Sequence, residues 1–224
     1  MKAIRRLFLF LIVVSFAVGS TDAQVPNTGA NPWEEDIREF ERADSLHPPP
    51  RGGFLFVGSS SIRMWETVRE DFPDLQVINR GFGGSELSDA LYFADRIILP
   101  YKPRMIIVYA GDNDLANGKQ AEVVCSDYKR LVRSIHTNLP TTRIAYISIK
   151  PSLARWNLVD KIRKTNRLIK EYSAQDRQLA YIDIFTPMLG KDGTPRKELL
   201  APDGLHLNRQ GYALWRKVVR PFLQ

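Results

Sequence analysis

Buried-strand patterns and amphipathic-helix patterns alternate along most of the chain. Five short apolar runs have the length and residue types of buried strands, at 54–57, 75–78, 105–109, 144–149 and 181–184. Apolar residues recur at helical spacing in about 33–46, 62–70, 86–99, 121–139, 158–172 and 208–219. Such an alternation predicts parallel strands joined by right-handed crossovers, with helices on both faces of one sheet.

The first residues have the pattern of a secretory signal peptide. Basic residues precede an apolar run at 7–18, and a small residue, Ala23, stands where cleavage is expected. The run is short for a membrane span, and no cysteine follows it closely enough to carry a lipid anchor. We therefore expect a signal peptide at 1–23, a flexible linker at 24–32 and a single domain with an N-terminal helix at 33–224. Cleavage predicts an exported protein, periplasmic or extracellular, with no stable membrane anchor, and an uncleaved anchor is the alternative.

Composition and charge narrow the class of protein. With 44% hydrophobic and 25% charged residues, 224 residues fit one globular domain with an ample core. The net charge of +7 becomes +5 without the leader, and the basic residues are scattered over predicted solvated helix faces, so nucleic-acid binding is not expected. The single cysteine, Cys125, lies among apolar helix positions and is interpreted as a packed thiol. The oligomeric state is not predicted.

Polar turns follow three of the predicted strands. Serines occupy 59–61 after the first strand, Gly84 follows the second strand and Asn113 follows the third, while Asp203 and His206 lie in the loop before the last helix. Because parallel strands end at one edge of a sheet, these residues can meet there. The serines alone are equally typical of helix N-caps or of a phosphate-binding loop.

The five positions together indicate a serine hydrolase. A serine such as Ser60 needs a base, which His206 can supply, and the imidazole needs a carboxylate, which Asp203 can supply from three residues away. The backbone N–H groups of Ser60 and Gly84, with the side-chain amide of Asn113, would form an oxyanion hole. We therefore predict Ser60, Asp203 and His206 as the catalytic residues.

At these residues the sequence resembles the SGNH hydrolases, also called the GDSL lipase/esterase family, and their platelet-activating-factor acetylhydrolase-like branch most of all. The family's serine, glycine, asparagine and histidine blocks match, in order and spacing, Ser60 in FVGSSSI, Gly84 in NRGFGGS, Asn113 in AGDND and His206 in DGLH. The resemblance implies a flavodoxin-like three-layer α/β/α sandwich with a five-stranded parallel sheet. Ser59 stands where the family's first block usually has aspartate, and Ser61 is the nearest rival nucleophile.

The resemblance implies a serine ester hydrolase that cleaves short-chain acyl esters, above all acetyl esters, of carbohydrates or other small molecules. No histidine or further carboxylate motif accompanies Asp112 and Asp114, so no metal is predicted, and no cofactor is expected. Lys150, Arg155 and Trp156 follow the fourth strand and are expected to contact substrate, although solvated bases and a packed tryptophan are an equal alternative. Two other functions remain open. One is a lysophospholipase or acyltransferase with the same triad, and the other is a non-catalytic phosphate- or flavin-binding module of flavodoxin-like fold.

Overall fold

A five-stranded parallel sheet forms the centre of the domain. The computed structural model describes residues 31–224, and residues 32–224 form one compact unit. The strands are β1 (Phe54–Gly58), β2 (Val77–Gly81), β3 (Met105–Tyr109), β4 (Arg143–Ile147) and β5 (Leu179–Ile182). They are arranged in the order β2-β1-β3-β4-β5, and every neighbouring pair is parallel, as the alternation predicts. The predicted signal peptide at 1–23 and most of the predicted linker lie outside the described residues.

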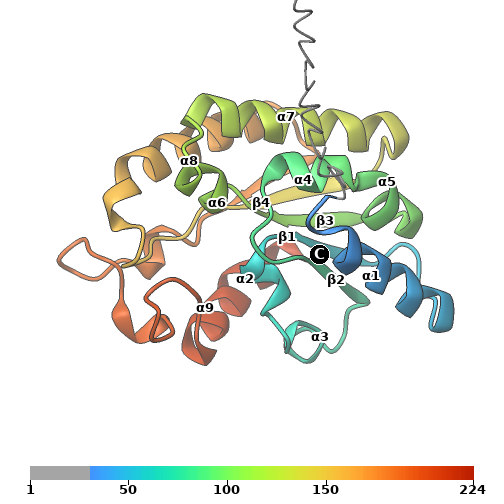
Figure 1. Ribbon diagram of the computed structural model, residues 1–224, viewed down its shortest axis with the longest axis horizontal. Coiled ribbons are helices and arrows are strands. Elements are labelled where there is room, and N and C mark those ends of the chain that lie inside the picture. The colour runs from blue at the N-terminus through green and yellow to red at the C-terminus, as the bar shows by residue number, and fades with distance from the viewer. Residues whose placement is uncertain (1–30) are drawn as a thin grey trace, which may run out of the picture. The chain divides into compact units, whose positions relative to one another are not determined.

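Helices cover both faces of this sheet (Figure 1). Helices α1 (Glu34–Leu46), α4 (Leu87–Tyr92), α5 (Ala94–Ile97), α7 (Ala121–Asn138) and α8 (Val159–Ser173) share one hydrophobic core with one face. Helices α2 (Ser60–Arg63), α3 (Val68–Asp71) and α9 (Arg209–Val219) share a second core with the other face. Helix α6 (Asp112–Ala116) follows β3. Short 3-10 helices are η1 (Leu99–Tyr101), η2 (Trp156–Leu158), η3 (Thr186–Met188), η4 (Lys197–Leu199) and η5 (Arg220–Phe222).

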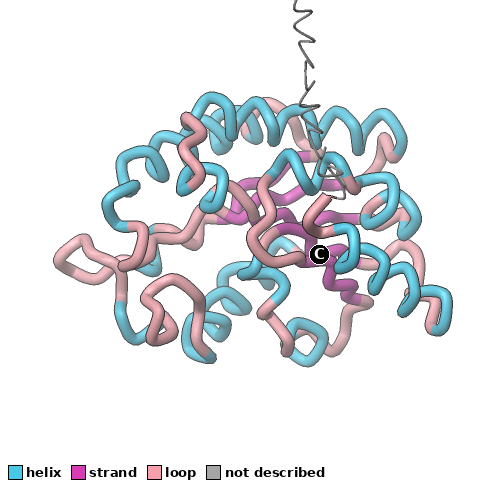
Figure 2. Tube along the Cα trace, in the orientation of Figure 1, coloured by secondary structure: helices cyan, strands magenta, loops and turns pink. Residues whose placement is uncertain are grey.

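The continuous apolar runs of the strands follow from this three-layer arrangement, which Figure 2 shows with the strands between two groups of helices. Successive side chains of a strand point to opposite faces, so a strand covered on both faces needs apolar residues at every position. In β1, Leu55 and Val57 pack in the core that contains α7, while Phe54 and Phe56 pack in the core that contains α9. The fold is therefore the predicted three-layer α/β/α sandwich.

Two predicted helices are broken in the structure. The segment predicted as one helix at 62–70 forms the end of α2 and most of α3, because the carbonyl oxygen of Ile62 accepts the side-chain amide of Asn79 (2.8 Å) and the N–H of Trp65 (3.0 Å) instead of the N–H of Glu66. The segment predicted at 86–99 forms α4 and α5. Phe93 separates them, with a buried ring and a backbone outside the helical region at φ −94° and ψ 7°.

Two further differences concern the polar turns. The second strand begins two residues later than predicted and extends to Gly81, which pairs with Gly58 of β1. Residues 79–81, which follow the predicted strand, therefore belong to the sheet and not to the turn after it. The turn after β3 contains a short helix, α6, that was not predicted. Within residues 31–224, none of the helices has the length and apolar character that a membrane crossing requires.

The order of the strands also locates a ligand site. From β1 the chain passes to β2 on one side, and the remaining strands lie on the other side of β1. In sheets of this kind, ligands bind beyond the carboxyl ends of the strands where the order changes direction. The ends of β1 and β3 therefore flank the expected site.

Candidate active site

Ser60 lies at the first turn of α2, directly after β1 leaves the sheet. Gly58 makes this exit possible, because its φ of +142° is in a region that residues with a side chain avoid. A Cβ atom at residue 58 would also lie 1.8 Å from the carbonyl oxygen of Tyr109 in the neighbouring strand. The close approach of β1 and β3 therefore requires glycine at residue 58. The sharp exit of the chain at Gly58 also fixes where α2 begins.

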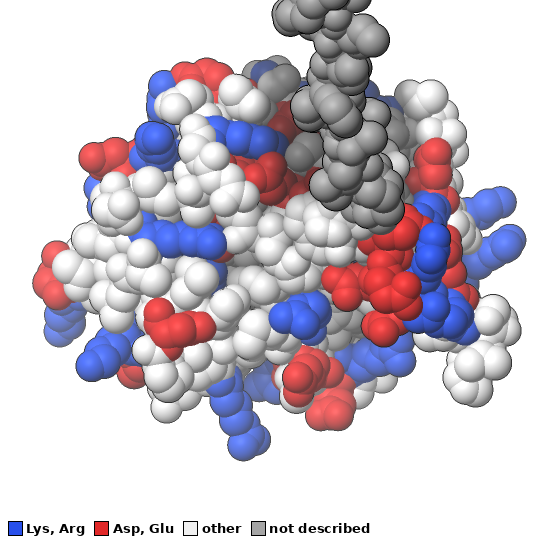
Figure 3. All heavy atoms as spheres, in the orientation of Figure 1, with Lys and Arg blue, Asp and Glu red and all other residues white. Residues whose placement is uncertain are grey.

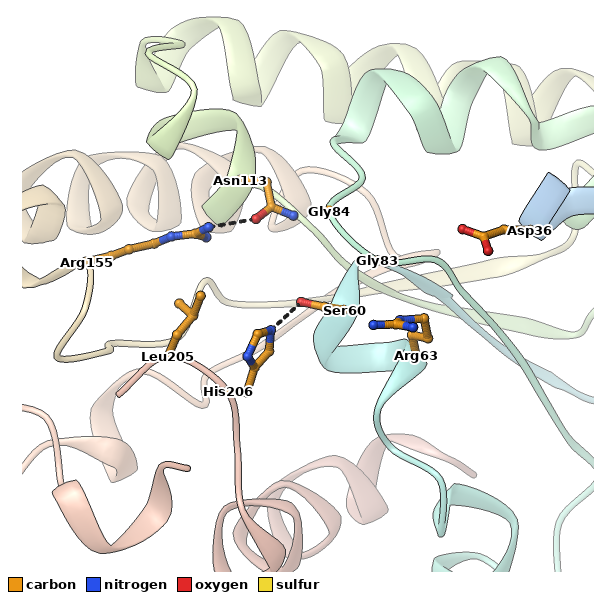
Figure 4. A pocket seen from close by; sticks show the side chains of 9 residues that line it. All are labelled: Asp36, Ser60, Arg63, Gly83, Gly84, Asn113, Arg155, Leu205 and His206. Carbon is orange, nitrogen blue, oxygen red and sulfur yellow. Dashed lines mark hydrogen bonds between the residues drawn. The ribbon is translucent and has the colours of Figure 1, made fainter. Parts of the chain in front are cut away.

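The three neighbouring serines lie in different surroundings. Ser59 and Ser61 are buried, at 0% and 1% exposure, whereas Ser60 is half-buried and lines a pocket of about 410 Å³. Figure 4 shows the side chain of Ser60 pointing toward His206. The structure therefore brings Ser60 rather than its neighbours within reach of an imidazole.

Asp203, His206 and Ser60 form a chain of two hydrogen bonds. Asp203 Oδ2 lies 2.6 Å from His206 Nδ1, and His206 Nε2 lies 3.1 Å from Ser60 Oγ. Asp203 Oδ1 also accepts the backbone N–H groups of Leu205 (2.9 Å) and His206 (3.0 Å), which closes the turn that carries the acid and the base. The three side chains have the order and spacing that let an imidazole take a proton from a serine.

The carboxyl group of Asp203 is held in its charged form. The hydrogen bond with His206, and after it the two backbone N–H groups, lower the pKa of Asp203 from 3.8 to about 2. Its side chain is 49% exposed, so solvent screens part of this interaction. A carboxylate beside Nδ1 keeps a proton on that nitrogen and leaves Nε2 free to accept one from Ser60.

Two backbone N–H groups are available beside the Ser60 hydroxyl. Within residues 31–224, neither the N–H of Ser60 nor that of Gly84 donates a hydrogen bond to the protein. Ser60 is the first residue of α2, where backbone donors have no partner inside the helix. Gly84 has a φ of +78°, and no atom lies within 4 Å of the place where a Cβ would stand. Both residues line the pocket, so both donors can serve an oxygen bound there.

Asn113 is held at both ends of its side-chain amide. Nδ2 donates to the carbonyl oxygen of Ser85 (3.0 Å), and Oδ1 accepts from Arg155 Nη2 (2.9 Å). A guanidinium group can only donate, so Oδ1 must face Arg155 and Nδ2 must face the side of the pocket where Gly84 lies (Figure 4). The second N–H of this amide is then available to the pocket, and the structure brings together Ser60, Gly84 and Asn113 as predicted.

A buried group of charges lies behind Asn113. The carboxylate of Asp112 is 3.1 Å from Arg155 Nη1 and 3.3 Å from Lys150 Nζ. Burial acts to raise the pKa of Asp112, but the charges of Lys150 and Arg155 outweigh burial and hold this pKa below its usual value. Burial also lowers the pKa of Lys150, and Asp112 offsets part of that effect. The ion pairs connect α6 to the segment after β4.

Lys150, which was predicted to contact substrate, does not line the pocket. Lys150 is 2% exposed, and its ammonium group contacts the Tyr109 hydroxyl and Asp112 instead of lining the pocket. A lysine after a strand usually extends into solvent, and here the buried carboxylate supplies the counter-charge that allows burial. Trp156 is half-buried, lies beneath the guanidinium of Arg163 and is not among the pocket residues. Arg155 does line the pocket.

Four pocket residues were not predicted as site residues: Asp36, Arg63, Gly83 and Leu205. Arg63 follows Ser60 by three positions, a spacing that places two side chains on the same side of a helix, so its place could have been inferred. Asp36 comes from α1, far from the other blocks in the sequence, and no local pattern connects it to them. Within the described part of the chain, no three His, Cys, Asp or Glu side chains are grouped closely enough to hold a metal ion.

The sequence profile of the GDSL-like lipase/acylhydrolase family matches residues 57–214. The match begins in β1 and ends in α9, so it contains every predicted catalytic residue and excludes α1. None of the curated protein sequences compared with the chain matches it.

Several solved structures have the same fold. A Streptococcus pneumonia protein proposed to be a platelet activating factor superimposes with a TM-score of 0.75 at 23% identity, over 85% of this chain and 92% of that one. A GDSL-like lipase from Bacteroides thetaiotaomicron superimposes with a TM-score of 0.71 at 16% identity, over 84% of this chain and 97% of that one. A mutant of an acetyl-xylooligosaccharide esterase from Geobacillus Stearmophilus superimposes with a TM-score of 0.62 at 14% identity, over 76% of this chain and 94% of that one. With its family match over most of its length, the chain belongs to the GDSL-like lipase/acylhydrolase family, the SGNH hydrolases, and is a carboxylic ester hydrolase.

Proposed function

We propose that the protein is a serine esterase that removes short acyl groups, above all acetyl groups, from carbohydrates or other small alcohols. The observation that carries this proposal is the chain of hydrogen bonds from Asp203 through His206 to Ser60, which ends in a pocket. A site that only binds phosphate or flavin has no use for an imidazole aligned between a carboxylate and a serine hydroxyl.

In the acylation half of the reaction, Ser60 Oγ attacks the carbonyl carbon of the ester while its proton passes to His206 Nε2. The carbonyl oxygen becomes an oxyanion, which accepts hydrogen bonds from the N–H groups of Ser60 and Gly84 and from the side-chain amide of Asn113. The bond between the carbonyl carbon and the alcohol oxygen then breaks. His206 gives its proton to the departing alcohol, and the acyl group remains on Ser60.

In the deacylation half, a water molecule attacks the acyl-enzyme and gives a proton to His206 Nε2. The same three donors stabilise the second oxyanion. The ester bond to Ser60 breaks, the carboxylic acid leaves, and His206 returns the proton to Ser60 Oγ. The Asp203 carboxylate stabilises the charged imidazole in both halves.

The lining of the pocket supports a small polar substrate. Among the described residues that line it, Leu205 carries the one apolar side chain, whereas Asp36, Arg63 and Arg155 present charged groups. A long acyl chain would have to lie against these charges, which binding would then desolvate at a cost. The fold of an acetyl-xylooligosaccharide esterase is similar, and this supports an acetylated carbohydrate as the substrate.

We further propose that the enzyme is exported and acts outside the cytoplasm, because the leader pattern at 1–23 precedes the domain. A periplasmic or extracellular enzyme has access to esterified glycans. N-terminal sequencing of the protein recovered from the producing cells should find a mature chain that starts near Gln24. An intact Met1 on most of the recovered protein would contradict cleavage.

Two assays test the proposed reaction. A fluorophosphonate probe should label Ser60 in the wild type, and the label should be lost in His206→Ala, because the serine is then not activated. On p-nitrophenyl acetate, butyrate and octanoate, kcat/KM should decrease with chain length, and acetylated sugars should be deacetylated. The highest rate on octanoate would favour a lysophospholipase or acyltransferase, and an unlabelled protein with a bound yellow cofactor would favour a binding module.

A further inference from the structure

The N-terminal helix contacts the loop that carries Gly84. Trp33, the residue that caps α1, donates its indole N–H to the carbonyl oxygen of Gly83 over 2.7 Å. The Trp33 ring also packs edge-on against Phe82, with the ring centroids 6.1 Å apart. Helix α1 lies outside the segment that the family profile matches, 57–214.

The hydrogen bond determines the direction of a neighbouring N–H group. The carbonyl of Gly83 and the N–H of Gly84 belong to one planar trans peptide, in which these two bonds point in opposite directions. When Trp33 holds the oxygen on one side, the N–H of Gly84 is directed to the other side. Figure 4 shows the chain at Gly83 and Gly84 passing beside Ser60 and the side chain of Asn113.

This peptide has little resistance of its own to rotation. It lies between two glycines, which lack the Cβ atoms that restrict backbone dihedral angles, and Gly84 already has a φ of +78°. Reversal of the peptide plane would withdraw the N–H of Gly84 and turn the carbonyl oxygen of Gly83 toward the pocket. An oxygen in that place would repel a developing oxyanion instead of stabilising it. The active orientation therefore needs a partner outside the loop.

We propose that Trp33 is a positioning residue for ester hydrolysis, which holds the N–H of Gly84 in the oxyanion hole by binding the carbonyl oxygen of Gly83. This inference rests on the proposed function, because it takes Ser60, Gly84 and Asn113 as the residues that surround the oxyanion. By this proposal the N-terminal end of α1 supports the oxyanion hole, and the same helix contributes Asp36 to the pocket wall.

Helix α1 is firmly attached, as an anchor for a flexible peptide must be. Ile37 is fully buried, and Arg96 of α5 forms ion pairs with Glu34 (2.8 Å) and Glu41 (2.6 Å). At the opposite end of the helix, Asp44 pairs with Arg80 of β2. Figure 3 shows acidic and basic side chains side by side over this part of the surface.

The test removes the indole N–H and little else. Trp33 is replaced by Phe, and separately by 3-benzothienylalanine, in which sulfur takes the place of the N–H group and the shape of the ring is kept. In both variants, kcat on p-nitrophenyl acetate should decrease by about tenfold to a hundredfold while KM changes by less than about twofold, because the lost interaction acts on charge that develops in the transition state.

Arg220→Ala provides the matched control, since it removes a surface ion pair with Asp74 and leaves α1, its attachment and the Trp33 donor in place. It should keep the wild-type kcat. Wild-type kcat in the benzothienylalanine variant would overturn the inference, and so would an equal loss of kcat in Arg220→Ala. If Ser60 is still labelled by the fluorophosphonate, only the role of Trp33 fails. If Ser60→Ala remains active, the proposed function itself fails.

Discussion

Arg155 donates a hydrogen bond to the side-chain oxygen of Asn113, and this contact decides which end of the asparagine amide faces the pocket. The oxygen and nitrogen of an amide have the same shape, so packing alone cannot choose between the two orientations. A guanidinium group can only donate, and it is itself held by Asp112. Arg155 therefore has an orienting role in addition to its place in the pocket wall.

Replacement of Asn113 by Ala should lower kcat by about a hundredfold to a thousandfold and leave KM similar, because the amide acts on charge that develops in the transition state. Steady-state kinetics on p-nitrophenyl acetate would measure both constants. Unchanged turnover would remove Asn113 from the oxyanion hole.

Replacement of Arg155 by Met should also lower kcat, by about tenfold or more, because the Asn113 amide loses the partner that orients it. The uncharged p-nitrophenyl acetate separates this effect from any contact between Arg155 and a charged substrate. A variant that changes KM on a charged ester and leaves kcat on the neutral ester intact would show that Arg155 only binds substrate.

The three serines should respond differently to replacement by Ala. Ser60→Ala should reduce kcat by something on the order of a millionfold, as loss of a triad nucleophile does in other hydrolases. Ser59→Ala and Ser61→Ala should retain most of the activity, since both side chains are buried away from the pocket. Peptide mass analysis after fluorophosphonate labelling identifies the modified serine. A label on Ser61 would make the nucleophile assignment wrong.

The loss of activity in acid should follow a single proton. The pKa of Asp203 is about 2, so its carboxylate stays charged at every pH where an imidazole takes up a proton. Because the carboxylate stays charged, the loss of activity should involve one proton, and log(kcat/KM) should decrease with a slope of about one as the pH decreases. A slope of two would mean that Asp203 titrates in the same range.

The stability of the fold should depend on pH through Asp114. Burial raises the pKa of Asp114 from 3.8 to about 6, and the hydrogen bond from Lys119 limits this rise. Between about pH 4 and 6 the folded chain keeps a proton that the unfolded chain has lost, so the free energy of unfolding decreases as the pH rises through this window. A shift of this size corresponds to on the order of 2–3 kcal/mol.

Urea unfolding of the wild type and of Asp114→Asn, measured from pH 4 to pH 7, tests this account, because the amide does not titrate. The wild type should lose on the order of 2–3 kcal/mol relative to the variant over this range, with little further change above it. A constant difference between the two proteins would show that Asp114 is already ionised at pH 4. Asp203→Asn is the control, since the pKa of Asp203 lies below the window.

The sheet and the catalytic blocks could be predicted because both depend on short stretches of sequence. A run such as Met105–Tyr109 needs apolar residues at every position to be buried on two faces, and such a run is visible in the sequence. Ser60 and Asn113 lie in short helices directly after β1 and β3, Gly84 lies in the loop after β2, and His206 lies in the loop before α9. Parallel topology brings the segments after successive strands together at one edge of the sheet.

The remaining features depend on contacts between distant segments. The burial of Lys150 follows from the carboxylate of Asp112, and the break between α2 and α3 follows from the side chain of Asn79. Neither partner is close in sequence to the residue it affects. The contact between Trp33 and Gly83 joins residues 50 positions apart. From the sequence alone, a tryptophan before a helix is expected only to pack against the core.

The hydrogen bond between Ser60 and His206 joins residues 146 positions apart, near opposite ends of the folded domain. A chain in which the loop before α9 has not yet docked contains an ordinary serine, with no base beside it. Chemical reactivity therefore appears only once this long-range contact has formed. The rate at which a refolding sample gains fluorophosphonate labelling would report when the two ends of the domain meet, and unfinished chains would remain inert toward the esters around them.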